Sequence, residues 1–177
     1  MNDHRRWAPF RTAFSDIEEP SRDRFDVVAL SPDIVGMTYR YPDYYEVGRE
    51  KIREYATAVK NEDGAYFDDD AAQALGHDAI LAPLTFVAIF GLQAQLAFFE
   101  HLNIAITDEK IVQVEQGLKL FEPIKAGDRL YCHIRLDSLR QSYGADVLTI
   151  RSRITNQHGH TVQEDYTVLA GRSEATG

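Results

Sequence analysis

The sequence contains a single cysteine, Cys132, among 177 residues. One thiol cannot form an intramolecular disulfide, so a disulfide-stapled extracellular domain is not expected. The sequence also lacks a long apolar run: the most apolar stretch, near residues 84–99, is interrupted by Gly91, Gln93 and Gln95. No apolar segment of signal-peptide length stands near Met1. These features predict a cytoplasmic protein without a membrane span.

Positive charge is in short supply, since 19 Lys and Arg residues stand against 28 Asp and Glu residues, for a formal net charge of −9. A nucleic-acid partner would require clustered basic side chains, and none is expected. The same charge disfavours attraction of an acidic carrier protein, unless basic residues gather locally.

Residues 1–28 differ from the rest of the chain. They mix acids with arginines, contain Pro9 and Pro20, and show no sustained apolar period. This composition predicts a disordered N-terminal tail. One domain is expected over residues 29–172, followed by a short tail over 173–177.

Three helices are expected in the first half of the domain. Apolar residues recur at helical spacing over residues 48–59. A short helix over 68–75 can be capped by Asp68. A third helix, from Pro83 to about residue 102, is apolar on nearly every side, which is typical of a buried helix.

The second half of the domain predicts strands. Four candidates, over residues 111–121, 129–139, 146–155 and 161–170, are separated by segments rich in turn-forming residues. A run of antiparallel strands after one buried helix predicts an α+β fold in which the sheet wraps around that helix.

Several short sequence words occur in the order found in a known family. They are Asp33-Ile-Val-Gly-Met37, Tyr41-Pro-Asp43, Val47 to Ala56, Leu81-Ala-Pro-Leu-Thr-Phe86, Ile111 to Gln116, Ala126-Gly-Asp128 and Leu169-Ala-Gly171. The chain resembles the MaoC-like hot-dog (3R)-hydroxyacyl-thioester dehydratase subunits of actinobacteria. The resemblance is greatest to the HadA-type subunit of the mycobacterial fatty-acid synthase II dehydratase, and the HadC-type subunit shares several of the words.

The resemblance implies a hot-dog fold and a role in long-chain fatty-acid elongation. The reaction would be loss of water from a (3R)-3-hydroxyacyl group on acyl carrier protein, without a cofactor. It also implies a heterodimer, in which a catalytic hot-dog subunit supplies the acid/base pair and this chain supplies the groove for the acyl chain. Family members begin near Val28, which makes Val28 a candidate start of translation.

The family's catalytic motif, Asp-x-Asn-Pro-x-His, is degenerate in this chain. Aligned by the spacing to Gly76 and Ala82, its Asp falls on Asn61 and its His on Tyr66. An amide cannot act as a carboxylate base, and a phenol is a poor base at neutral pH. The oxyanion-binding helix start carries Pro83, which has no N–H to donate. We therefore expect no catalytic residue here; a shift of register would offer an Asp without its His.

A substrate channel is expected along the third helix, where Thr85, Ala88, Gly91, Ala94 and Gln95 combine small and polar side chains. The competing interpretation is that the small residues allow close packing and that Gln95 bonds within the core. No metal site is expected, because the histidines lack further ligands and Asp68-Asp69-Asp70 is typical of a helix start. Alternative functions are a self-sufficient hot-dog acyl-thioesterase and a non-enzymatic acyl-binding homodimer.

Overall fold

The computed structural model describes residues 30–104, 111–143 and 145–172. The two expected tails and the candidate start at Val28 lie outside these residues. The elements in chain order are η1 (Pro32–Ile34), β1 (Thr38–Arg40), β2 (Tyr45–Glu46), α1 (Arg49–Ala58), η2 (Gly64–Tyr66), α2 (Asp69–Ala74), α3 (Val87–His101), β3 (Ile111–Leu120), β4 (Arg129–Ser142), β5 (Ala145–Thr155) and β6 (Thr161–Arg172).

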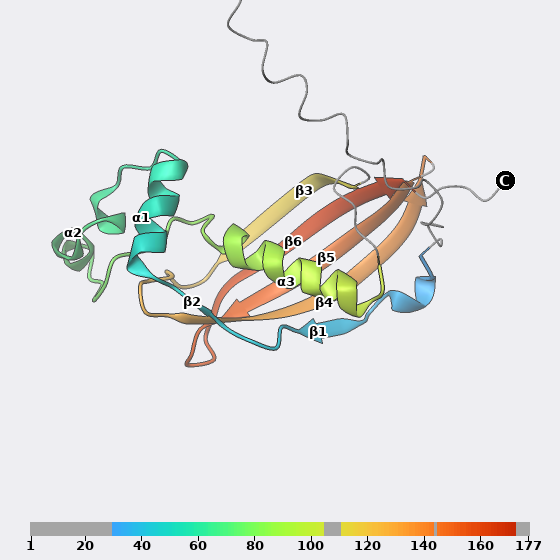
Figure 1. Cartoon of the computed structure of the whole chain (residues 1–177), viewed down its shortest axis with the longest axis horizontal. Helices are drawn as coiled ribbons and strands as arrows, with labels where there is room; N and C mark the ends of the chain where they lie inside the picture. Colours follow the sequence, from blue (N-terminus) through green and yellow to red (C-terminus); the bar gives the residue numbers. More distant parts are fainter. Residues whose placement is uncertain (1–29, 105–110, 144, 173–177) are drawn as a thin grey trace, which may run out of the picture.

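The described strands form one antiparallel sheet with the order β1-β4-β5-β6-β3, and β2 pairs with the start of β4. The three long strands β4, β5 and β6 form its centre, and β3 is an edge strand. Helix α3 lies across one face of the sheet, while α1, η2 and α2 form a lobe at one end (Figure 1). The expected hot-dog arrangement, an antiparallel sheet wrapped around a central helix, is confirmed.

The core lies between α3 and the sheet. Phe86, Phe90 and Phe98 have at most 1% of their surface exposed, and alternate residues of β4 from Leu130 to Leu136 face them. Full burial of each large apolar side chain stabilises the fold by about 1.5–3 kcal/mol before entropy is subtracted. Packing against the sheet therefore holds α3 in place.

Helix α3 begins at Val87, four residues after the expected start at Pro83. The segment between them forms a turn in which the Phe86 N–H donates to the Pro83 carbonyl. Just before it, the N–H of Ala82 donates to the carbonyl of Ile124, which ties this segment to the loop before β4. Tertiary pairing thus overrides the preference of proline for a first helical turn.

Burial on every side of α3 was also expected, and here the structure differs. Leu92 and Leu96 are 60% and 49% exposed. One side of the helix therefore carries large apolar residues that the described chain leaves uncovered.

Candidate functional site

The segment that aligns with the family's catalytic motif, residues 61–66, begins in an exposed loop after α1 and runs through η2. Lys60 adopts a left-handed backbone conformation with φ of 56° and turns the chain out of α1. Asn61 is exposed, and its side-chain oxygen accepts a hydrogen bond from the N–H of Asp63. The side chain of Asn61 therefore stabilises the loop locally.

Tyr66 ends η2 and is half-buried against the core, where it packs among apolar side chains. No hydrogen bond joins Asn61 to Tyr66 among the described residues. Pro83 is buried, and its carbonyl is occupied by the N–H of Phe86. These three positions do not form an acid/base pair with an oxyanion donor in the described chain.

Two aspartates near the loop cap the short helices that follow them. Asp63 accepts from the N–H of Ala65 at the start of η2, and Asp68 accepts from the N–H of Ala71 at the start of α2. The capping role expected for Asp68 is confirmed. A capping bond of this kind stabilises a helix by about 1 kcal/mol.

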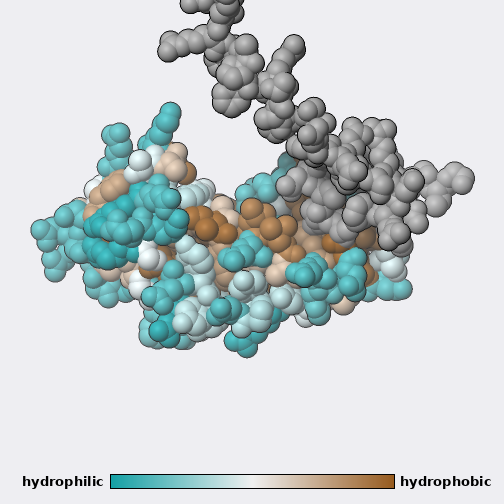
Figure 2. Space-filling view, in the orientation of Figure 1, coloured by the Kyte–Doolittle hydropathy of each residue, from teal (hydrophilic) through white to brown (hydrophobic). Residues whose placement is uncertain are grey.

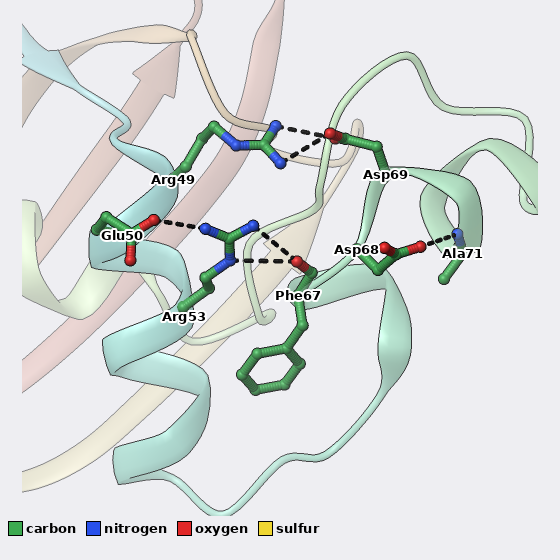
Figure 3. Close-up of polar contacts among 7 residues, drawn as sticks. All are labelled: Arg49, Glu50, Arg53, Phe67, Asp68, Asp69 and Ala71. Carbon is green, nitrogen blue, oxygen red and sulfur yellow. Dashed lines mark hydrogen bonds and ion pairs between the residues drawn. The ribbon is translucent and has the colours of Figure 1, made fainter.

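Two arginines of α1 hold the lobe together (Figure 3). Both terminal nitrogens of Arg49 bond to the Asp69 carboxylate at 2.9 and 2.8 Å, which lowers the pKa of that carboxyl. Arg53 donates through Nε and Nη2 to the Phe67 carbonyl at 3.1 and 2.9 Å, and through Nη1 to Glu50. These bonds fix the degenerate loop against α1.

Of the five expected channel residues, Thr85 lies in the turn before α3, and the other four are divided between the exposed and the buried side of the helix. Thr85 and Ala88 are exposed, and the hydroxyl and carbonyl of Thr85 accept from Tyr55 Oη at 3.0 and 2.8 Å. Gly91, Ala94 and Gln95 are buried, and Gln95 donates to Thr167 Oγ1 of β6 at 3.2 Å. Positions three apart drift by about 60° around a helix, which separates Ala88 from Ala94.

An exposed apolar surface runs along α3. Ala88, Leu92 and Leu96 stand four residues apart and share one side of the helix, and Leu84 is exposed in the turn just before it. Figure 2 shows an apolar band along this part of the molecule. Leu84 is the most exposed of the leucines, at 65%.

The edge strand β3 continues this surface. Gln116 pairs with Thr167, whose side chain faces α3, so Gln116, Leu118 and Leu120 lie on the helix side of the sheet. Leu118 and Leu120 are 40% and 44% exposed. We call the exposed stripe of α3 together with these three β3 residues the α3–β3 surface. The sequence offered a signal for it in the four-residue spacing of Ala88, Leu92 and Leu96.

A row of buried polar side chains lies beneath α3 on the next strand. Gln163, Asp165 and Thr167 alternate along β6 on the helix side and are at most 5% exposed. Among the described residues, Gln163 Oε1 and Asp165 Oδ1 have no hydrogen-bond partner. Burial raises the pKa of Asp165. Sequence reasoning missed this row, although three polar residues at alternate positions of a central strand are a visible signal.

Within the described ranges, no group of three metal-ligating side chains is present. His158 and His160 are exposed in the β5–β6 hairpin. Cys132 is fully buried, and desolvation raises the pKa of its thiol to about 12, so it is not a nucleophile at neutral pH. No helix of the described part of the chain is long and apolar enough to cross a membrane.

Comparison with known proteins places these features in context. The model of a family described as FAS1-like, dehydratase domain region, matches residues 33–165. The UPF0336 protein ML1910 of Mycobacterium leprae is 57% identical over 145 residues, which cover 82% of this chain and 91% of the relative. The UPF0336 protein Rv0635 of Mycobacterium tuberculosis is 55% identical over 150 residues, covering 85% of this chain and 95% of that protein.

A solved structure is also similar over the whole domain. It is the C-terminally truncated HadBC (3R-hydroxyacyl-ACP dehydratase) complex from Mycobacterium tuberculosis. One chain of that complex is 46% identical to this chain, with a TM-score of 0.73, covering 80% of this chain and all of that one.

Proposed function

Since this chain belongs to the FAS1-like dehydratase-region family, we propose that it is the HadA-type, non-catalytic subunit of a heterodimeric (3R)-3-hydroxyacyl-thioester dehydratase. Its role is to hold a long acyl chain, delivered on acyl carrier protein, while a second hot-dog subunit supplies the catalytic Asp and His. The complex acts as a hydro-lyase that uses no cofactor.

The observation that carries the proposal is the state of the motif positions. Dehydration needs a base for the α-proton and an acid for the leaving hydroxyl, both within hydrogen-bond reach of adjacent carbons. The described chain offers an amide engaged in its own loop at Asn61 and a half-buried phenol at Tyr66. A complete reaction centre therefore requires groups from another chain.

The α3–β3 surface has properties that suit both the proposed partner and the proposed substrate. An edge strand with free backbone groups is a template for pairing with a second chain, and exposed large apolar residues mark an interaction surface. The same surface is apolar enough to accept an alkyl chain between α3 and the partner. Ala88 begins the stripe, and Thr85, exposed in the turn before α3, lies nearer to Pro83.

The HadA-type assignment, in preference to HadC-type, has support from the identities. The chain is 55% identical to one Mycobacterium tuberculosis relative and 46% identical to the matching chain of the HadBC complex. The chain is therefore more similar to that relative than to the HadBC chain, which favours a subunit type other than those of the HadBC complex.

The test is co-expression of this chain with a hot-dog protein that carries an intact Asp-x-Asn-Pro-x-His motif. Size-exclusion chromatography should show a 1:1 complex, and the complex should hydrate trans-2-enoyl thioesters of long chain length while this chain alone shows background rates. Hydration by the chain alone would refute the non-catalytic role. Thioester hydrolysis by the chain alone would establish the thioesterase alternative, and acyl binding by an inactive homodimer would establish the binding-protein alternative.

A further inference from the structure

The row of buried polar side chains on β6 lies one strand away from the α3–β3 surface. Its three members, Gln163, Asp165 and Thr167, pair in the sheet with the three β3 residues of that surface, in the order Leu120, Leu118 and Gln116. Neighbouring strands of a sheet are about 4.8 Å apart. A group that lies along the helix side of β3 is therefore one strand spacing from the row.

Strand β5 adds a fourth buried polar side chain. Ser152 lies directly opposite Asp165, and both are buried on the helix side of the sheet. Residues directly opposite in an antiparallel sheet have Cβ atoms about 4.5–5.5 Å apart, so their oxygens can share one small group. Gln163 stands two residues before Asp165 on the same side of β6, and its longer side chain can extend to the same group.

Three oxygens of these side chains have no hydrogen-bond partner among the described residues. They are Ser152 Oγ, Gln163 Oε1 and Asp165 Oδ1. The remaining member of the row, Thr167, accepts from Gln95. A buried polar group without a partner costs about 1–3 kcal/mol, and such groups are rare in proteins. Three of them at adjacent positions therefore indicate a hydrogen-bonding group from outside the chain.

Two other buried polar side chains show how the fold normally meets this need. Asp128 accepts from the backbone N–H of Lys125 and from Gln157 Nε2. Asn156 accepts from two backbone N–H groups of the β5–β6 hairpin. Both are satisfied by neighbouring groups of the chain, whereas the three oxygens beneath α3 are not.

The chemistry of the three oxygens defines the group that fits. The Gln163 amide oxygen accepts hydrogen bonds, as does Asp165 Oδ1, and the Ser152 hydroxyl both donates and accepts. Burial raises the pKa of Asp165 and so favours its neutral form. In the same row of the sheet, Leu118 and Ile134 flank this pair and carry no charge. A neutral O–H group therefore fits better than a cation.

We propose that Ser152, Gln163 and Asp165 form a binding site for one neutral O–H group, supplied by water or by a hydroxyl group on the alkyl part of the bound acyl chain. Water has two protons and can serve both acceptors, while an alcohol has one. The acyl source rests on the proposed function, because it takes the acyl chain to lie on the α3–β3 surface. An alcohol on such a chain reaches the row by one C–O bond and a hydrogen bond of about 2.8 Å, which together cover most of a strand spacing.

A crystal structure of the full-length chain without acyl ligand tests the site itself, whether or not a catalytic partner is present. We expect one ordered water oxygen within about 3.2 Å of Asp165 Oδ1 and of at least one of the other two oxygens. The absence of an ordered oxygen there would overturn the site. A rubidium ion located there by anomalous scattering would overturn its neutral character.

Kinetics of the complex with the catalytic subunit identify the source. The substrates are trans-2-enoyl-coenzyme A thioesters of one chain length, either unsubstituted or with one hydroxyl group at successive positions along the distal half of the chain. An acyl source predicts that one position raises kcat/KM at least fivefold over the unsubstituted chain. Asp165→Leu should bring this ratio to within twofold of one, and Asp165→Asn should retain it, because asparagine keeps an acceptor oxygen.

The matched control is Thr149→Val, an isosteric loss of a hydroxyl group on β5. Thr149 is half-buried and lies on the opposite face of the sheet from Ser152, so this variant should keep the ratio of the wild type.

Equal kcat/KM for every chain, with ordered water in the crystal structure, would assign the site to water. A preference that survives Asp165→Leu would overturn the acyl source, since the hydroxyl group would then bind elsewhere. A complex that hydrates none of the chains would refute the proposed dehydratase function instead, and the crystal structure would still decide the site.

Discussion

Asp165 of β6 lies directly opposite Ser152 of β5, and both side chains are buried beneath α3. Neither Asp165 Oδ1 nor Ser152 Oγ has a hydrogen-bond partner among the described residues. Burial raises the pKa of the Asp165 carboxyl group. The fold therefore holds a carboxyl group where its charged form is disfavoured.

Asp165→Asn should make the stability of the chain less dependent on pH. The folded-state pKa of Asp165 is raised, so its contribution is complete below its unfolded pKa of about 4 and is lost as the pH rises through the folded value. The variant lacks this loss and should be more stable than the wild type at neutral pH by about 1 kcal/mol. Urea unfolding of both proteins at a series of pH values measures the difference between their unfolding free energies. A difference that does not change with pH would contradict the prediction.

If the chain is the non-catalytic subunit, as proposed, Asn61→Ala and Tyr66→Phe should leave kcat of the heterodimer within about twofold of the wild type, because neither side chain would take part in proton transfer. The matched control is removal of the motif Asp of the catalytic subunit, which should abolish turnover. A fall in kcat of a hundredfold or more for either substitution in this chain, which corresponds to about 2.7 kcal/mol of barrier, would restore these positions to the reaction centre.

Leu92→Glu together with Leu96→Glu should prevent assembly with the catalytic subunit, because a buried interface cannot accept unpaired carboxylates. Leu75→Glu is the matched control: Leu75 is 61% exposed, like Leu92 at 60%, but lies just beyond α2, away from the α3–β3 surface. Size-exclusion chromatography of co-expressed proteins gives the reading. Retained assembly of the Leu92 and Leu96 variant would place the partner elsewhere.

Much of the fold was predictable, because helical spacing and strand alternation are local signals. The strands β3 to β6 lie within a few residues of the expected ranges, and Asp68 caps its helix as expected. The start of α3 was not predictable, since it depends on the bond between Ala82 and Ile124, which are far apart in sequence.

The sites were less predictable than the fold. The absence of the motif's Asp and His, on which the proposed non-catalytic role rests, is a matter of residue type at Asn61 and Tyr66 and is visible in the sequence. The group of arginines on the face of the sheet opposite α3 could not be predicted from the sequence. These arginines come from three strands and meet only through the register that places Arg135 opposite Arg151. The formal net charge of −9 describes the whole chain and gives no sign of a local group of basic residues.

Ala88→Trp should shorten the longest acyl chain that the heterodimer accepts. Ala88 is exposed on the α3–β3 surface, where an indole ring would occupy volume proposed for the alkyl chain. The value of kcat/KM should fall at least tenfold for long chains and remain within twofold for short ones. An equal loss for all lengths would indicate impaired pairing.

The control for this variant is Gly91→Ala on the buried side of α3. A Cβ at Gly91 would meet only Val87 Cγ1, at an ordinary 3.8 Å. The substitution should leave chain-length preference unchanged and should stabilise the helix by about 0.5–1 kcal/mol, because alanine loses less backbone entropy than glycine.

Gly117→Ala should loosen the edge strand β3. Gly117 pairs with Tyr166, whose ring lies across the Gly117 backbone, so a Cβ there would overlap the ring. The ring cannot swing away freely, because Tyr166 Oη donates to Glu115 Oε1 at 2.6 Å. We expect a loss of about 1–3 kcal/mol in unfolding free energy, together with weaker assembly with the catalytic subunit, since β3 supplies the free edge.

A double-mutant cycle separates this steric cause from the general cost of altering a strand. Tyr166→Ala removes the ring and its bond to Glu115, so Gly117→Ala should then cost little or become favourable, which gives a coupling energy above about 1 kcal/mol. Additive effects of the two substitutions would show that the ring does not exclude a side chain at residue 117. In that case the glycine would have no steric role, and the stability of the β3 edge would rest on its backbone ladder with β6 alone.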